Sequence, residues 1–154
     1  MRYWLMKSEP DDFSIADLAR KKREPWTGVR NYQARNYMRD EMRVGDGVLF
    51  YHSSCPVPGV YGLGTVASAP YPDPTQFDPK SDYHDLESRR DEPRWVLVDV
   101  AYAKTFAAPV TLEMLKDDPK LESLVALRKG NRLSITPVEK AHYDRIVAAG
   151  TQSR

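Results

Sequence analysis

Residues 95–102 read WVLVDVAY and give the clearest strand signal in this chain of 154 residues. Valine stands at positions 96, 98 and 100, and the residues between the valines face the opposite way in an extended chain. Asp99 belongs to that second face, which indicates that the face is partly exposed. Valine also packs well on a pleated surface because it is branched at Cβ. The fold is therefore expected to be built around a β-sheet.

Three other stretches have the composition of strands. Residues 2–7 combine Tyr, Trp, Leu and Met, residues 48–51 are an apolar run that leads into His52 and Ser53, and residues 60–67 follow a turn. The last of these contains closely spaced glycines, which predict a strand that lets another backbone approach closely. Their order does not match a dinucleotide-binding motif or a P-loop, so no nucleotide cofactor is expected.

Helix signals separate these strands. Ser14 and Asp17 have the spacing of a capping box, and residues 31–42 place apolar side chains on one helical face. A third helix is expected from Thr111 to just before Pro119. Residues 136–139 combine Thr, Pro and Glu in the order of an N-cap, a first-turn proline and a capping acid, and so predict a last helix that ends at Gly150.

Strands and helices in this order do not alternate regularly, which predicts an α+β domain or a small barrel with peripheral helices. No repeat or linker divides the chain, so we expect one domain over residues 1–150 and a short tail at 151–154. No apolar run approaches the roughly 20 residues of a membrane span, and none resembles a secretory signal core. We expect a cytoplasmic protein, monomeric and without membrane association.

Charge is spread unevenly although the net charge is only +1. Residues 20–43 hold eight Lys or Arg against three acids, and residues 73–92 hold seven acids against three Lys or Arg. A histone-like mode of DNA binding is therefore excluded, because any affinity for nucleic acid must come from local patches. Cys55 is the sole cysteine and the three histidines are scattered, so neither a disulfide nor a metal site is expected.

The sequence YHSSC at residues 51–55 raises the question of a nucleophile activated by His52. Cys55 follows in a stretch rich in proline, and the chain lacks a G-x-S-x-G elbow. Proline favours an extended path that carries the thiol away from the imidazole. We therefore expect no catalytic residue, and we interpret these polar groups as the end of a strand.

The sequence WTGVRNYQARN at residues 26–36 combines the large ring of Trp26, a glycine, two asparagine amides and two arginines. That set suits a nucleobase, which offers a π-face for stacking, an edge for hydrogen bonds and a phosphate nearby. The alternative is structural, with Trp26 in the core, Asn31 as a helix cap and the arginines in solvent. Residues 70–93 form a loop rich in proline and aromatic residues, which is typical of a docking segment.

Several motifs together resemble the EVE domain family, in the family's order and over nearly the whole chain. They are KSEP at 7–10, WTGVRNYQARN at 26–36, GD at 45–46, FYHS at 50–53, YPDP at 71–74, YHD at 83–85 and RLSITPV at 132–138. The resemblance implies a PUA-like fold, a compact β-barrel with flanking helices. It also implies kinship with YTH domains, which read methylated adenine in RNA, and a role as a reader of modified bases, in bacteria often suspected of sensing modified DNA.

The same resemblance implies a base-binding pocket. Lys7 and Ser8 match the pair that lines the YTH pocket, Trp26 matches its first aromatic wall, and Asn31 follows it. In the EVE pattern His52 and Ser53 close the mouth. The chain departs from YTH domains at the second wall, since the loop over residues 71–92 contains no Trp, and Tyr71, Phe77 or Tyr83 stands in its place.

We therefore predict a module without catalytic activity that binds DNA or RNA through one extruded, modified base. The base pocket is formed by Lys7, Ser8, Trp26, Asn31, His52, Ser53 and Tyr83, and the phosphates are held by Arg30, Arg35, Arg39 and Arg132. Two alternatives stay open. One is a sensor of a small molecule or nucleotide that uses the same pocket, and the other is an enzyme that acts on a modified base through His52 and Cys55.

Overall fold

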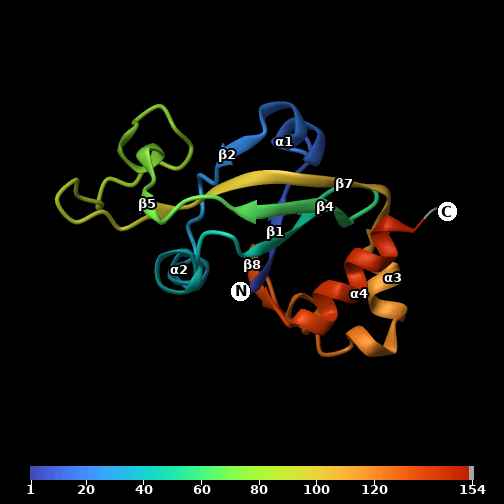
Figure 1. The fold of residues 1–154 in the computed structure, drawn as a ribbon. Helices are drawn as coiled ribbons and strands as arrows, with labels where there is room; N and C mark the ends of the chain where they lie inside the picture. Colours follow the sequence, from blue (N-terminus) through green and yellow to red (C-terminus); the bar gives the residue numbers. More distant parts are fainter. Residues whose placement is uncertain (153–154) are drawn as a thin grey trace.

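The computed structural model describes residues 1–152 as a mixed α+β fold around a curled sheet. Six strands form the sheet in the order β2-β7-β4-β3-β1-β8, and β1 and β3 are parallel neighbours while the other pairs are antiparallel. The sheet bends into a half-barrel with helices around it, as Figure 1 shows. The predicted PUA-like class is confirmed.

The boundaries of the elements are as follows. The strands are β1 (Tyr3–Ser8), β2 (Arg23–Pro25), β3 (Gly47–His52), β4 (Gly59–Val66), β5 (Tyr71–Pro72), β6 (Val96–Leu97), β7 (Asp99–Thr111) and β8 (Ile135–Val138). The α-helices are α1 (Ile15–Lys21), α2 (Tyr32–Asn36), α3 (Leu112–Asp117) and α4 (Lys140–Thr151). A π-helical turn (Tyr37–Glu41) continues α2, and short 3₁₀ turns lie at Pro74–Phe77, Pro119–Leu121 and Val125–Leu127.

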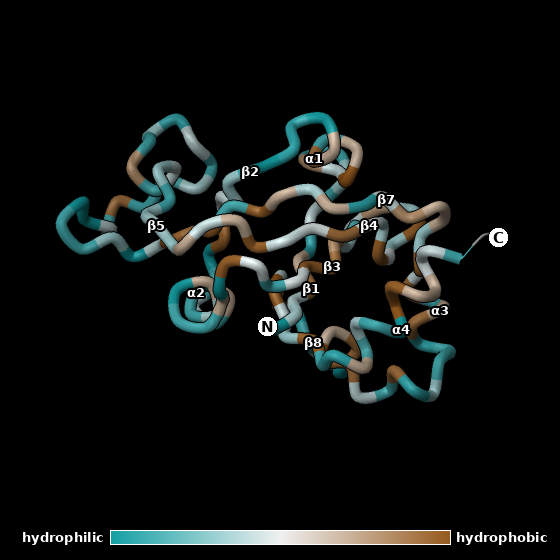
Figure 2. Tube along the Cα trace, viewed as in Figure 1, coloured by the Kyte–Doolittle hydropathy of each residue, from teal (hydrophilic) through white to brown (hydrophobic). Residues whose placement is uncertain are grey.

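The sheet is buried on both faces, which accounts for the continuous apolar runs of its central strands. Every residue of β3 is buried. Phe50 points into one cluster together with Trp4 and Met6, and Leu49 points into a second cluster that α3 and α4 cover. Figure 2 shows hydrophobic residues along the central strands and hydrophilic ones along most of the loop over residues 70–93.

The glycines of β4 lie against the backbone of β7, as their spacing predicts. A Cβ atom on Gly59 would lie 2.4 Å from the carbonyl oxygen of Val110, and one on Gly62 would lie 2.4 Å from that of Lys104. Contacts this short do not occur for real Cβ atoms, so the two strands can approach this closely only with glycine at these positions.

Three predicted helix starts are present. Ser14 and Asp17 form the reciprocal capping box of α1, and the Asn31 side chain accepts hydrogen bonds from two backbone amides at the start of α2. Thr111 caps α3. These starts depend on hydrogen bonds within one turn, which is why the sequence reveals them.

The predicted start of the last helix is wrong. Residues 135–138 form β8, which pairs antiparallel with β1, and the helix begins at Lys140. Thr136 lies opposite Leu5 in the sheet and is fully buried, so pairing with β1 outweighs the local capping pattern. Pro137 fits there because β8 is an edge strand. The helix includes Thr151, one residue more than predicted, and residues 153–154 of the predicted tail lie outside the described part.

The predicted strand over residues 95–102 is present but interrupted. Val96 and Leu97 pair with Tyr71 and Pro72 as a separate two-stranded ribbon, and the main sheet resumes at Asp99. Between them, the carbonyl of Val98 accepts a hydrogen bond from the amide of Trp26. Of the helices in residues 1–152, none is long and apolar enough to cross a membrane.

Candidate nucleic-acid interface

A cavity of about 910 Å³ opens where β1 and β3 end. Because these strands are parallel, their carboxyl ends meet at the same edge of the sheet, and the amide of Ser53 donates to the carbonyl of Ser8 at 3.0 Å. The segment over residues 24–31 forms one wall, and Asp82 and Tyr83 reach the cavity from the loop over residues 70–93. The chain before β8 completes it.

Eight of the eleven predicted site residues line this cavity. They are Lys7, Ser8, Trp26, Arg30, Asn31, Ser53, Tyr83 and Arg132. His52, Arg35 and Arg39 do not line it. The structure therefore brings together residues from five separate parts of the sequence and leaves out three that sequence reasoning grouped with them.

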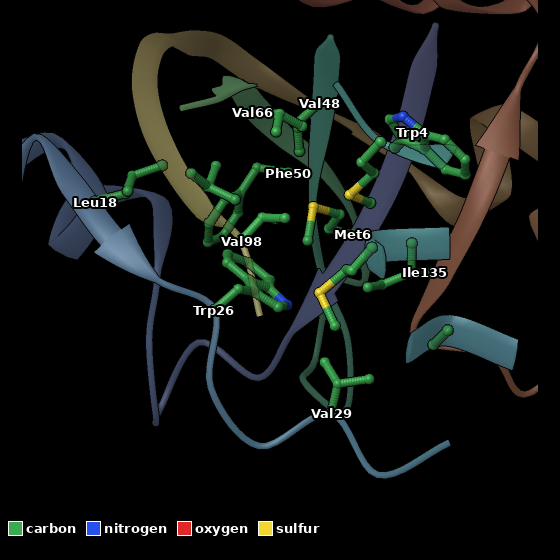
Figure 3. Packing of buried hydrophobic residues seen from close by; sticks show 14 of the residues in the cluster. Trp4, Met6, Leu18, Trp26, Val29, Val48, Phe50, Val66, Val98 and Ile135 are labelled. Atoms are coloured by element: carbon green, nitrogen blue, oxygen red, sulfur yellow. The ribbon is translucent and has the colours of Figure 1, made fainter. Parts of the chain in front are cut away.

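Trp26 borders the cavity but belongs mainly to the core. Its side chain is 8% exposed, and its ring meets that of Phe50 edge to face, with the ring centroids 5.6 Å apart. Figure 3 shows the indole next to Val98, within the cluster that also contains Phe50. Trp26 is therefore mainly a core residue, as the structural alternative predicts. Stacking of a base on the small exposed part of its ring stays a prediction.

Tyr83 is the aromatic residue of the loop that reaches the cavity. It is 44% exposed, and its ring lies directly on Gly28, where a Cβ atom would approach it to 2.6 Å. Gly28 also has a φ of +85°, a backbone conformation that side chains rarely adopt. The other two candidates for the second wall are engaged elsewhere, since Tyr71 donates to Asp99 and Phe77 packs under Arg90.

A buried carboxylate fixes this loop to the wall of the cavity. Asp73 is fully buried, and its Oδ2 accepts from the Gly28 amide at 2.8 Å and from Arg30 Nη1 at 3.1 Å. Its Oδ1 accepts from the amide and hydroxyl of Thr75. Arg30 also donates to the Tyr83 carbonyl. Arg30 therefore holds the two segments together instead of standing free for a phosphate.

The Asn31 side chain caps a helix, as the structural interpretation predicts, and its base contact stays a prediction. Its Oδ1 caps α2 by accepting from the amides of Gln33 and Ala34, at 2.9 and 3.1 Å. Among the described residues its amide nitrogen has no partner, and the residue is exposed at the cavity wall. The amide nitrogen is therefore available as a donor.

His52 is a core residue and does not close the mouth of the cavity. It is 6% exposed, its ring stacks on Tyr61 at 3.9 Å, and its Nε2 accepts from the amide of Ile15 at 3.1 Å. This bond places the ring proton on Nδ1. Burial lowers the pKa of His52, so the imidazole is neutral near pH 7.

Arg35 and Arg39 are likewise placed differently from the prediction. Arg35 packs on the ring of Tyr32 and donates to the carbonyl of Arg94, and burial lowers its pKa. Arg39 pairs with Asp40 on the surface. Neither guanidinium group lines the cavity, and the same segment buries Ala34 and Met38 in the core.

Charge around the cavity is balanced. Its cationic residues are Lys7, Lys21, Arg30 and Arg132, and its acidic residues are Glu9, Asp12, Glu24 and Asp82. Sequence reasoning missed these acids, and it also missed the roles of Asp73 and Gly28. The cavity is thus suited to a neutral group with hydrogen-bonding edges, and phosphate groups need positive charge from elsewhere. The described residues hold no group of three or more His, Cys, Asp or Glu arranged for a metal ion.

Comparison with known proteins agrees with the fold and the motifs. The sequence model of the EVE domain family matches residues 2–149. This chain belongs to the EVE domain family. Thymocyte nuclear protein 1 of Mus musculus is 37% identical over 165 aligned residues, which cover 95% of this chain and 72% of the mouse protein.

Solved structures of other EVE domain proteins superpose closely. A protein from Pseudomonas syringae is 47% identical, with a TM-score of 0.92, over 96% of this chain and 98% of that one. The human THYN1 protein, solved in complex with DNA that contains 5-methylcytosine, is 35% identical, with a TM-score of 0.93, over 100% of both chains. The family is therefore shown by sequence and by structure.

Proposed function

We propose that this EVE domain binds DNA and holds one extruded base, a modified cytosine, in the cavity at the ends of β1 and β3. The observation that carries the proposal is its likeness over the whole chain to the human protein in complex with DNA that contains 5-methylcytosine. The cavity adds independent support because it combines aromatic, apolar and hydrogen-bonding groups.

The size and walls of the cavity suit a nucleobase. Its volume of about 910 Å³ lies within the range of small-ligand sites and leaves room for the attached sugar. Tyr83 offers an exposed ring for stacking, and Trp26 also lines the cavity. An extruded base needs both a stacking surface and partners for its edge.

The carboxylates of the cavity suit a base with an exocyclic amine, and cytosine is one such base. Carboxylates accept hydrogen bonds from the exocyclic amine of cytosine, and Glu9 and Asp82 are exposed at the cavity wall. Phe13 and Val29 provide apolar surface of the kind that a C5-methyl group contacts. Hydrogen bonds and apolar contacts therefore determine which base is held.

The energetic balance requires contacts beyond the base. Extrusion from a duplex costs a few kcal/mol, and stacking on an aromatic ring returns roughly 1–3 kcal/mol. Stacking alone thus offsets the cost at best. The remaining affinity comes from hydrogen bonds in the cavity and from phosphate contacts, so binding depends on salt concentration.

The geometry at His52 argues for binding over catalysis. A nucleophilic Cys55 needs a basic lone pair close by, and the Nε2 lone pair of His52 is engaged by the Ile15 amide. Neither residue lines the cavity.

Replacement of Tyr83 tests the proposal. Fluorescence anisotropy is measured with matched duplexes that carry 5-methylcytosine or cytosine at one position, together with the free modified nucleoside. We expect Tyr83→Ala to reduce the preference for the methylated duplex about tenfold, since a stacked ring contributes about 1–3 kcal/mol. Tyr83→Phe keeps the ring and is expected to keep the preference. Tyr71→Ala removes a ring of the same loop outside the cavity and serves as the control.

The outcomes separate the alternatives. A wild-type protein with equal affinity for both duplexes contradicts a modified-base reader. Tight, salt-independent binding of the free nucleoside without affinity for DNA identifies a small-molecule sensor instead. A change in the mass of the nucleoside, lost in Cys55→Ser, identifies an enzyme.

A further inference from the structure

We call the cavity of about 910 Å³ at the ends of β1 and β3 the base pocket. A second cavity lies beside it and is lined by cations. It has a volume of about 320 Å³ and is bordered by the end of β1, by α3 and by residues 126–131. Its charged residues are Lys7, Lys116, Arg128 and Lys129, and its lining includes no acidic residue. This differs from the base pocket, where acids and bases balance.

These cations have no ionic partner in the described part of the chain. Arg30, Arg94 and Arg145 each form an ion pair with a carboxylate, and so do many exposed arginines. Lys7, Lys116, Arg128 and Lys129 form none within residues 1–152. Four neighbouring cations without carboxylates repel one another, and an anion bound among them would remove that repulsion.

Lys7 joins the two cavities. It lines both of them, and its backbone amide donates to the carbonyl of Ser134, which ties it to the chain before β8. The side chain is half-buried beside the ring of Tyr51, and burial lowers its pKa. A phosphate in contact with the amine would reverse this shift, because an opposite charge stabilises the ammonium form.

The turn between the cavities is held by its own hydrogen bonds. We call residues 128–132, RKGNR, the basic turn. Gly130 has a φ of +79°, Asn131 Nδ2 donates to the carbonyl of Val125, and Asn131 Oδ1 accepts from the amide of Leu133. Arg128 borders the second cavity, and Arg132 borders the base pocket. The turn therefore presents cations along a path from one cavity to the other.

We propose that the second cavity and the basic turn bind the phosphodiester backbone of the DNA strand next to the extruded nucleotide. The proposal deepens the proposed function, because it names the surface that holds phosphates while the neutral pocket holds the base. Lys116, Arg128 and Lys129 take the flanking phosphates, and Lys7 contacts the nucleotide at the entrance to the pocket. Arg30 and Arg35, which the sequence assigned to phosphates, are engaged by Asp73 and by the carbonyl of Arg94 instead.

A triple variant tests the surface. Lys116→Gln, Arg128→Gln and Lys129→Gln are combined, and affinity for methylated and unmethylated duplexes is measured over a series of salt concentrations. Each lost phosphate contact lowers the slope of log K against log salt by about 0.9, so we expect a decrease of about 2–3. Affinity at low salt should fall at least tenfold and equally for both duplexes. The control combines Lys80→Gln, Arg89→Gln and Arg90→Gln, the same charge change at three residues that line neither cavity.

Each result decides one question. An unchanged slope and affinity in the triple variant overturn the phosphate surface, and the base pocket then stands on the wild-type preference for methylated DNA. A loss of that preference in the triple variant alone shows that the turn reads the base and also overturns the inference. In another outcome the wild type binds both duplexes equally while the triple variant binds both more weakly. That combination contradicts the proposed base pocket and supports the phosphate surface. Inorganic phosphate is added as a competitor. If the second cavity binds phosphate but the triple variant keeps its affinity for DNA, the cavity is a small-anion site only.

Discussion

The strongest test of the architecture at the site is the replacement Asp73→Asn. The carboxylate is fully buried and accepts four hydrogen bonds, two at each oxygen. An asparagine amide keeps one oxygen and turns its NH₂ group toward two donors, whichever way it is oriented. Two hydrogen bonds are lost if the amide faces Gly28 and Arg30, and one, at the Thr75 backbone amide, if it faces Thr75, because the Thr75 hydroxyl can turn and accept.

The magnitude follows from these contacts. A buried donor left without its acceptor costs about 1–3 kcal/mol, and Arg30 loses its ionic partner as well. Arg30 keeps its bonds to the Tyr83 carbonyl and is 21% exposed, which reduces the cost. We expect a loss of about 3 kcal/mol in the free energy of unfolding. For a chain of this size that lowers the melting temperature by about 6–12 °C.

Thermal and urea unfolding measure this change, and Asp91→Asn is the matched control. Asp91 lies at the exposed end of the same loop and pairs only with exposed Arg89, so its replacement should leave the melting temperature unchanged. Asp73→Asn should also weaken the preference for the methylated duplex, because Gly28 and Tyr83 lose their fixed positions. A melting temperature within about 2 °C of the wild type would refute the view that Asp73 ties the loop to the cavity wall.

Two further predictions concern the core. Because burial lowers the pKa of His52 below its unfolded value of 6.5, stability is retained above that pH and lost as pH falls below it. Urea unfolding at about pH 7.5 and 5.5 should show that His52→Gln removes up to about 1 kcal/mol of this dependence, and equal pH dependence in both proteins would contradict the assignment. Gly62→Ala should cost about 2–3 kcal/mol because its Cβ meets a β7 carbonyl at 2.4 Å. Gly45→Ala has a φ of +95° and open space, so it should cost only about 1–2 kcal/mol, and the reverse order would argue against close approach of β4 and β7.

Local signals predicted most of the fold, and pairing between distant strands accounts for the error. The capping box of Ser14 and Asp17 involves residues three positions apart and survives folding unchanged. The similar pattern at residues 136–139 is overridden, because Thr136 and Pro137 pair with β1 more than 130 positions earlier in the chain. No local pattern encodes that pairing.

The candidate site was predictable in outline and not in its charges. The resemblance predicted a shared site for Lys7, Ser8 and Ser53. The structure brings them together because β1 and β3 are parallel and end at the same edge of the sheet. It could not show that Arg30 pairs with Asp73, because Asp73 lies in the loop over residues 70–93 and the sequence does not predict the path of that loop. Nor could it show that His52 faces the core, because β3 is buried on both faces and alternation gives no preference.

The placement of charge leads to a separation of roles within the molecule. The base pocket carries equal numbers of acids and bases, so its selectivity depends on shape and hydrogen bonds and should change little with salt. The second cavity carries cations alone, so it supplies the affinity that salt weakens. Lys7 borders both, and its half-buried amine gains an ionic partner only when the backbone enters. In the proposed complex a phosphate beside this amine stands at the entrance of the base pocket, so one side chain contacts both the backbone and the bound nucleotide.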